Sequence, residues 1–355
     1  MINIDKRLTR NDLMKKTATL LFMLLMISMF AQVLAGCTYQ VEAMPDNEPD
    51  VELAFNTNIE PDVVENEPKT ENEYYYSFTD SLGNAVKLKE KPQKVVSLVG
   101  SYAETWLLAG GELAGVTDDV ISQRNIEIPS ESIIVGTIKD PNLEEVIALS
   151  PDFVLLSPDV ESHVKISETL EKSDIAHAFF KVEHFEEYLD MLDICTDITG
   201  EKELYKKNGL EVKRQIDEVL SRIDVKEAPE ILFIRAFSSG AKAKDDDNFA
   251  CRILDDLGTV NIASKHESIL EELSIEEVIQ EDPDYIFVVT MGDSEKAIQA
   301  LKDGIERNPA WRKLSAVKND RYIVLPKELF HYKPNARWGE SYEYLARILY
   351  PEKFE

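Results

Sequence analysis

The sequence is poor in the residues that form covalent or metal-centred cross-links. Three cysteines and five histidines occur among 355 residues. A disulfide scaffold needs a dense, even set of cysteines, and a metal site needs three or four converging ligands. Five widely spread histidines do not indicate such a site, and no permanently bound cofactor or metal is predicted. Cys195 and Cys251 lie in helical, apolar contexts, where we expect small buried residues rather than a bridge.

Sequence motifs of common enzyme classes are also missing. There is no phosphate-binding Gly-x-x-x-x-Gly-Lys loop, no Gly-x-Ser-x-Gly elbow and no His-Glu-x-x-His helix. The run of aspartates at 245–247 lacks the spaced oxygen ligands of a calcium loop, which favours a solvated turn. The chain is therefore predicted not to be an enzyme. A surface-anchored enzyme or a metal-binding protein on a related fold is the alternative from another class.

Basic residues are few relative to acidic ones. The chain has 39 Lys and Arg against 67 Asp and Glu, a formal net charge of −28. Such a field repels nucleic acid and anionic lipid head groups. Neither is predicted as a partner.

The N-terminus has the pattern of an export signal. A basic lead precedes a short apolar run, which ends in Leu34-Ala35-Gly36-Cys37. This ending resembles the lipobox of bacterial lipoproteins, in which cleavage leaves a lipid-modified cysteine as the first mature residue. Cys37 is thus the predicted lipidation site, and the protein is predicted to be anchored on the extracytoplasmic face of the cell membrane. Residues 37–73, rich in Pro, Asn and Glu, are predicted to form an acidic, flexible tether.

One segment occurs twice. Residues 142–157 align without a gap with residues 274–289, and six of the sixteen positions are identical. Each copy predicts a helix, a Pro-Asp turn and a buried strand. Asn142 and Ser274 are predicted helix N-caps, each completed into a capping box by the glutamate three residues later. Glu144 and Glu276, at the second helical position, then remain outward-pointing with no local role.

Strands and helices alternate on both sides of a helical connector, which predicts parallel sheets covered on both faces in each half. The expected elements are a β-hairpin at 76–88, buried strands at 95–99 and 231–234, loops at 100–102 and from residue 235 onward, helices ending at glycines 110 and 258, and connecting helices at 183–199 and 201–223. The predicted fold is α/β, with two Rossmann-like lobes of mainly parallel sheets joined by one long backbone helix. The predicted segments are a signal peptide (1–36), a tether (37–73), an N-terminal lobe (74–182), connecting helices (183–224) and a C-terminal lobe (225–355).

The order of these motifs resembles one family closely. It comprises the lipobox, the acidic tether, the hairpin at 76–88, the strand at 95–99 with Glu104 shortly after, the two repeated segments and the run Asn308-Pro-Ala-Trp-Arg-Lys-Leu. The chain resembles the substrate-binding proteins of ABC importers for iron complexes, haem and vitamin B12, over about residues 76–352.

The resemblance implies a ligand held between the lobes and one glutamate on each lobe that docks to a dimeric permease with its ATPase. These glutamates match Glu144 and Glu276. Two like carboxylates suit a permease built of two like subunits; the alternative is a pair of solvated acids stabilised by the helix dipole. The expected ligand is a ferric siderophore, with haem or a corrinoid as alternatives.

Ligand contacts are expected at the carboxyl ends of the parallel strands, which face the crevice in such folds. The candidates are polar, basic or aromatic residues: Ser101, Tyr102, Lys139, Arg235, Phe237, Lys242, Lys244, Met291, His331, Tyr332 and Arg337. In so acidic a chain, these basic and aromatic side chains suit a large anionic chelate. The alternative for each residue is a surface cation or a core aromatic, and Trp311 and Trp338 are assigned to packing.

Overall fold

A computed structural model describes residues 74–355 of the chain. The predicted signal peptide, the tether and Cys37 lie outside the described residues. Within residues 74–355, no helix combines the length and the apolar character needed to cross a membrane.

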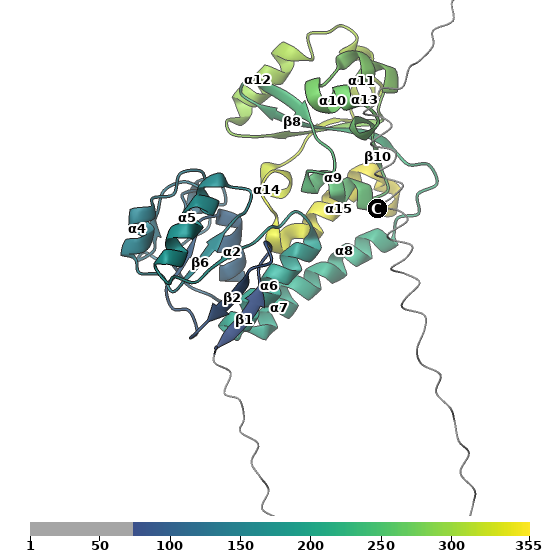
Figure 1. Cartoon of the computed structure of the whole chain (residues 1–355). Helices are drawn as coiled ribbons and strands as arrows, with labels where there is room; N and C mark the ends of the chain where they lie inside the picture. The colour runs from purple at the N-terminus through teal and green to yellow at the C-terminus, as the bar shows by residue number, and fades with distance from the viewer. Residues whose placement is uncertain (1–73) are drawn as a thin grey trace, which may run out of the picture. The chain divides into compact units, whose positions relative to one another are not determined.

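The first half of the described chain builds a two-stranded hairpin and a five-stranded parallel sheet. Its elements are β1 (Tyr76–Thr79), β2 (Ala85–Leu88), β3 (Val95–Ser97), α2 (Gly100–Leu108), β4 (Leu113–Val116), α3 (Asp119–Ser122), β5 (Ile133–Ile134), α4 (Leu143–Ala148), β6 (Phe153–Leu156), α5 (Glu161–Lys172) and β7 (His177–Phe179). The sheet order is β5-β4-β3-β6-β7. Strand β6 lies between α2 on one side and α4 and α5 on the other (Figure 1). The hairpin prediction is confirmed by antiparallel pairing of β1 with β2.

The second half builds another parallel sheet with one antiparallel addition. Its elements are β8 (Glu230–Phe237), β9 (Gly240–Ala243), α9 (Phe249–Asp256), β10 (Val260–Asn261), α10 (Glu267–Glu272), α11 (Ile275–Glu281), β11 (Tyr285–Thr290), α12 (Ser294–Gly304), α13 (Ser315–Lys318), β12 (Tyr322–Val324), α14 (Lys327–Phe330) and α15 (Trp338–Leu349). The parallel order is β10-β8-β11-β12, and β9 pairs antiparallel with β8. Two parallel-sheet lobes confirm the predicted fold class.

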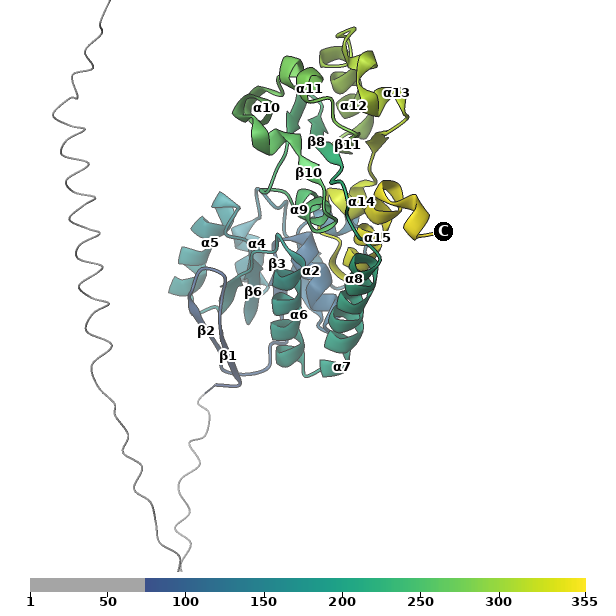
Figure 2. The ribbon, with the colours of Figure 1, turned by 90° about the vertical axis from the view of Figure 1, so that its right-hand side faces the viewer.

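Helices connect the two sheets. They are α6 (Phe185–Thr199), α7 (Lys202–Tyr205) and α8 (Glu211–Ser221). The prediction of one regular helix over 201–223 is wrong in detail, because a π-helical segment, Lys206–Leu210, separates α7 from α8. The hydroxyl of Tyr188 donates to the Asn208 carbonyl at 2.8 Å, which satisfies a carbonyl within this irregular turn. Helix α15 lies along α8 (Figure 2).

One hydrophobic core runs through both halves. It contains Phe153 of the first sheet, Tyr188 of α6, Phe287 of the second sheet and Trp338 of α15. Two smaller cores bury the opposite faces, one under α4 and α5 and the other under α10 to α13. Both sheets are thus covered on both faces, as parallel sheets require. Trp311 and Trp338 are buried packing residues, as predicted, and Cys195 and Cys251 are buried and free.

Two predicted loops are instead regular structure. Residues 100–102 form the first turn of α2, because the N–H of Gly100 donates to the buried Asp119 carboxylate at 2.8 Å and α2 therefore starts directly after β3. Arg235 lies inside β8, which continues to Phe237 because its last residues pair with β9. The partner strand β9 follows after a tight turn at residues 238–239, which the apolar run at 231–234 does not indicate.

Candidate functional site

Each sheet has a point where the chain reverses the direction in which it adds strands. In the first sheet this point lies between β3 and β6, and in the second it lies between β8 and β11. In open parallel sheets, ligands bind beyond the carboxyl ends of the strands at such points. Ser101 and Tyr102 follow β3, and Arg235 and Met291 lie at the ends of β8 and β11.

A basic cluster of Arg235, His331 and Lys333 forms at the second lobe's switch point. Arg235 comes from β8, while His331 and Lys333 follow α14. Burial lowers the pKa of the Arg235 guanidinium, although the nearby Asp247 carboxylate opposes this. Burial, and then the positive charge of Arg235 and of Lys327, lowers the pKa of His331 to about 4. The histidine is therefore neutral near pH 7.

Lys333 is a half-buried cation of the cluster. Burial lowers its pKa to about 8, the Arg235 charge acts in the same direction, and Glu183, Glu187 and Asp159 oppose both. Its Nζ lies 5.2 Å from the ring centroid of Phe249, at the start of α9. Lys333 thus stays mostly charged at pH 7 in a site that disfavours charge.

Two polar atoms of the cluster are buried without a partner. Among the described residues, neither Arg235 Nε nor His331 Nδ1 has a hydrogen-bond partner. A buried polar group without a partner costs stability, so it calls for an explanation. An incoming anion could accept a hydrogen bond from the Arg235 Nε. It would also be attracted by the positive charges of Arg235 and Lys333, and this attraction is stronger at the low dielectric of a half-buried site.

Three other predicted contact residues are buried or already paired with other groups. Tyr102 is buried, and its hydroxyl donates to the Phe180 carbonyl at 2.5 Å, so its side chain belongs to the core. Ser101 is also buried. Arg337 forms a bidentate ion pair with Glu340 at 2.7 and 2.9 Å.

The remaining candidates lie closer to the surface or beside the cluster. Lys139 is exposed in the turn before α4, and Met291 is 42% exposed. Phe237 is half-buried at the end of β8. Tyr332 is also half-buried, and its ring centroid lies 5.0 Å from that of His331. The structure therefore brings Arg235, His331 and Tyr332 together.

Lys242 and Lys244 belong to the β9 side of the second lobe. Lys242 is exposed opposite Arg235 in the β8–β9 pairing. Lys244 is committed to an ion pair with Asp247.

Sequence reasoning missed Lys333 as a member of the basic cluster. Lys333 lies within the basic and aromatic run 329–337 that supplied three of the candidates, so this run was the available signal. Lysines are mostly exposed in proteins, however, and no local pattern distinguishes a half-buried one.

Glu144 and Glu276 occupy matching places. Each is the second residue of its helix, α4 or α11, and each is exposed. Asn142 caps α4 as predicted, accepting from the backbone N–H groups of Glu144 and Glu145 at 3.2 and 3.3 Å.

The predicted capping boxes are wrong in both copies. The N–H of Asn142 donates to the Val135 carbonyl rather than to Glu145. Ser274 makes no side-chain cap, and Glu277 instead accepts a hydrogen bond from Ser268. Tertiary partners from neighbouring elements replace the local ones in each case.

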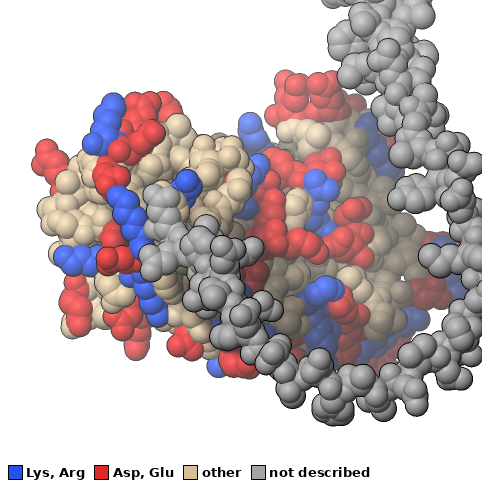
Figure 3. Space-filling model, turned by 60° about the horizontal axis from the view of Figure 1, so that its bottom comes forward, with Lys and Arg blue, Asp and Glu red and all other residues tan. Residues whose placement is uncertain are grey.

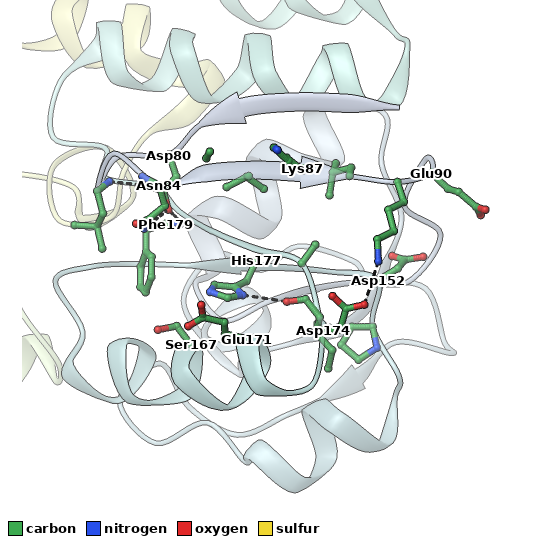
Figure 4. A pocket seen from close by; sticks show the side chains of 18 of the residues that line it. Asp80, Asn84, Lys87, Glu90, Asp152, Ser167, Glu171, Asp174, His177 and Phe179 are labelled. Carbon is green, nitrogen blue, oxygen red and sulfur yellow. Dashed lines mark hydrogen bonds and ion pairs between the residues drawn. The ribbon is translucent and has the colours of Figure 1, made fainter. Parts of the chain in front are cut away.

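A separate hollow of about 850 Å³ lies between the β1–β2 hairpin, α5 and β7 (Figure 4). Charges of both signs line it, and Lys89 forms an ion pair with Asp174 at 3.1 Å across it. None of the predicted contact residues lines this hollow. Among the described residues, no group of three His, Cys, Asp or Glu side chains is placed to hold a metal ion. Acidic and basic side chains are interspersed over the face in Figure 3.

Two parallel-sheet α/β lobes with a strand-order reversal in each are the architecture of a solute-binding protein. The family model for the periplasmic binding protein family matches residues 95–329. The chain belongs to this family.

Three comparisons illustrate its similarities. YhfQ of Bacillus subtilis (strain 168), named as an ABC transporter substrate-binding lipoprotein, is 26% identical over 70% of this chain and 80% of its own. The Fe(3+)-citrate-binding protein YfmC of the same organism is 25% identical over 64% of this chain and 71% of its own. The crystal structure of Staphylococcus aureus SirA with staphyloferrin B has a TM-score of 0.59 at 19% identity, over 79% of this chain and 98% of SirA.

Proposed function

We propose that this chain is the extracytoplasmic, lipid-anchored substrate-binding component of an ABC importer, and that it captures an anionic ferric chelate. The ligand class rests first on the basic cluster. Arg235 and Lys333 are partly desolvated cations in a chain of net charge −28. An overall acidic field repels an anionic chelate at a distance, so binding needs short-range pairing strong enough to outweigh it.

Relatives with iron ligands support this class. YfmC is named for ferric citrate, and SirA was crystallised with staphyloferrin B. A ferric chelate with carboxylate or catecholate oxygens would accept hydrogen bonds from Arg235 and Lys333, while Tyr332 would pack against its body.

Delivery would use the two matching glutamates. Glu144 and Glu276 are exposed at the second position of equivalent helices. A dimeric permease presents two like surfaces, and two like carboxylates complement them. Attachment through Cys37 would keep the protein beside that permease, because two acyl chains hold a protein more firmly than one.

A binding panel tests the proposal. The mature protein is titrated with ferric citrate, a ferric catecholate siderophore, haem and a corrinoid. Tight binding of one of the two anionic ferric chelates supports the proposal. Tight binding of the corrinoid alone would replace it with a vitamin B12 role, and haem alone would replace it with a haem role.

A further inference from the structure

Glu104 in α2 connects the first lobe to the loop that carries His331 and Lys333. Its Oε2 accepts from Arg124 Nε at 2.9 Å and lies 2.7 Å from Arg124 Nη2. The same oxygen accepts from Asn335 Nδ2 at 2.7 Å. Asn335 Nδ2 also donates to the Ser101 carbonyl at 2.9 Å.

Arg124 extends the network directly to the ligand-site loop. Its Nη2 donates to the backbone carbonyl of Lys333. The Arg124 side chain is 8% exposed, and Asn335 is 1% exposed. Asn335 also has a φ of +50°, a left-handed conformation that asparagine tolerates better than most residues. Burial and an uncommon backbone conformation indicate a loop held in one arrangement.

The first-lobe end of this network is closely packed. Helix α2 starts at Gly100, whose N–H donates to the Asp119 carboxylate, and Thr117 donates to the same carboxylate at 2.6 Å. A Cβ at Gly100 would lie 2.3 Å from Asp119 Oδ2, so the two segments approach as closely as glycine permits. Glu104, one turn further along α2, is therefore fixed relative to α3 and the following Arg124.

We propose that Glu104, Arg124 and Asn335, termed here the interlobe bracket, are positioning residues for ligand capture. The bracket holds residues 331–335 against the first lobe, and so holds Lys333 in the partly buried place where it meets the ligand. This inference rests on the proposed function. Without the bracket, the loop and the Lys333 side chain become ordered only on binding, and that ordering weakens affinity.

The test uses Glu104→Gln, which keeps the side-chain shape and removes its charge. Glu343→Gln is the matched control, because Glu343 pairs with Arg347 in an exposed i,i+4 pair of α15. With ferric citrate as probe, Glu104→Gln should weaken binding about tenfold, the cost of ordering one or two long side chains. The control should leave affinity within about twofold.

A double-mutant cycle separates positioning from general destabilisation. If the bracket acts through Lys333, Glu104→Gln should weaken chelate binding only slightly in a protein that already carries Lys333→Met. The affinity losses of the two changes are then non-additive. Additive losses would overturn the proposal. A ferric catecholate serves as probe if ferric citrate does not bind.

Amide hydrogen exchange of the ligand-free protein distinguishes failure of this inference from failure of the proposed function. Exchange across 331–337 should accelerate in Glu104→Gln, while β11 stays protected. If exchange across 331–337 is the same in Glu104→Gln as in wild type, the bracket does not hold this loop, whatever the ligand is. If the wild-type protein binds neither chelate, the ligand proposal fails, and the bracket is overturned as a determinant of chelate capture.

Discussion

Replacing Arg235 with methionine should separate ligand affinity from stability. The guanidinium is a partly desolvated cation whose Nε has no hydrogen-bond partner among the described residues. Losing a desolvated charge partner should weaken binding of an anionic ferric chelate by on the order of 2 to 5 kcal/mol. This corresponds to about 30-fold to several-thousand-fold in Kd. Arg235→Met keeps most of the side-chain volume, so little of this loss comes from a cavity.

The free protein should respond in the opposite direction. Replacing a buried, poorly paired charge with an apolar side chain of similar length should raise the free energy of unfolding by about 1 kcal/mol. The attraction of Asp247 for Arg235 limits the gain. Chelate titration by tryptophan fluorescence and urea unfolding of the ligand-free protein measure the two effects.

A matched variant controls for loss of charge alone. Arg307 forms an exposed ion pair with Asp303, so Arg307→Met should change neither affinity nor stability by more than about 0.5 kcal/mol. If Arg235→Met loses less than about threefold in affinity, Arg235 is not a ligand contact. If it loses affinity and stability together, its role is structural and the reasoning is refuted.

Lys333, the two matching glutamates and Cys37 give three further predictions. Burial lowers the pKa of Lys333 to about 8, so affinity for an anionic chelate should fall as pH rises from 7 to 9. The Lys333→Met variant should lack this fall. A wild-type affinity that does not change with pH would contradict a role of Lys333 in binding. Changing both Glu144 and Glu276 to Ala should abolish uptake of radiolabelled iron and ligand-stimulated ATPase activity, while the Kd for the ligand stays within a few-fold of wild type. Uptake that survives the double change would show that other residues dock to the permease. Cys37→Ser should abolish labelling with palmitate and leave uncleaved precursor or protein released to the medium, and a variant that still labels would refute lipidation at this position.

The stability of the ligand-free protein should also depend on pH through Lys333. The folded-state pKa of Lys333 is depressed below its ordinary value of 10.5. Between about pH 8 and pH 10.5 the unfolded chain therefore binds more protons at this residue, and its contribution to stability rises with pH. Urea unfolding of wild type and Lys333→Met across this range isolates the contribution from other titrating groups.

The sequence predicted the architecture well because its signals are local and repeated. Alternating strands and helices, the hairpin and the ends of helices near Gly110 and Gly258 all depend on short-range patterns. The regular helix over 201–223 failed at Lys206–Leu210, where Asn208 turns its amide to the Leu108 carbonyl at 2.7 Å. That partner lies 100 residues away, and helical periodicity contains no information about it.

The site was only partly predictable for the same reason. Arg235 could be chosen because it directly follows the predicted strand at 231–234. His331 could be chosen because it lies in the basic and aromatic run at 329–337. Tyr102 could not be recognised as a core residue, because its burial depends on Phe180 from the other end of the lobe. The surroundings of Lys333 come from two different lobes, because Arg124 donates to its backbone carbonyl and the Phe249 ring lies beside its Nζ.

Charge discrimination between ferric chelates separates recognition by the basic cluster from recognition of iron chelates in general. Ferric citrate or a ferric catecholate is anionic, whereas a ferric trihydroxamate is neutral. Their Kd values for the wild-type protein are compared at two salt concentrations by calorimetric titration. We predict that an anionic chelate binds at least about 100-fold more tightly than the neutral one, and that Arg235→Met removes most of this preference. Equal or tighter binding of the neutral chelate, unchanged by Arg235→Met, would show that the basic cluster does not select the ligand.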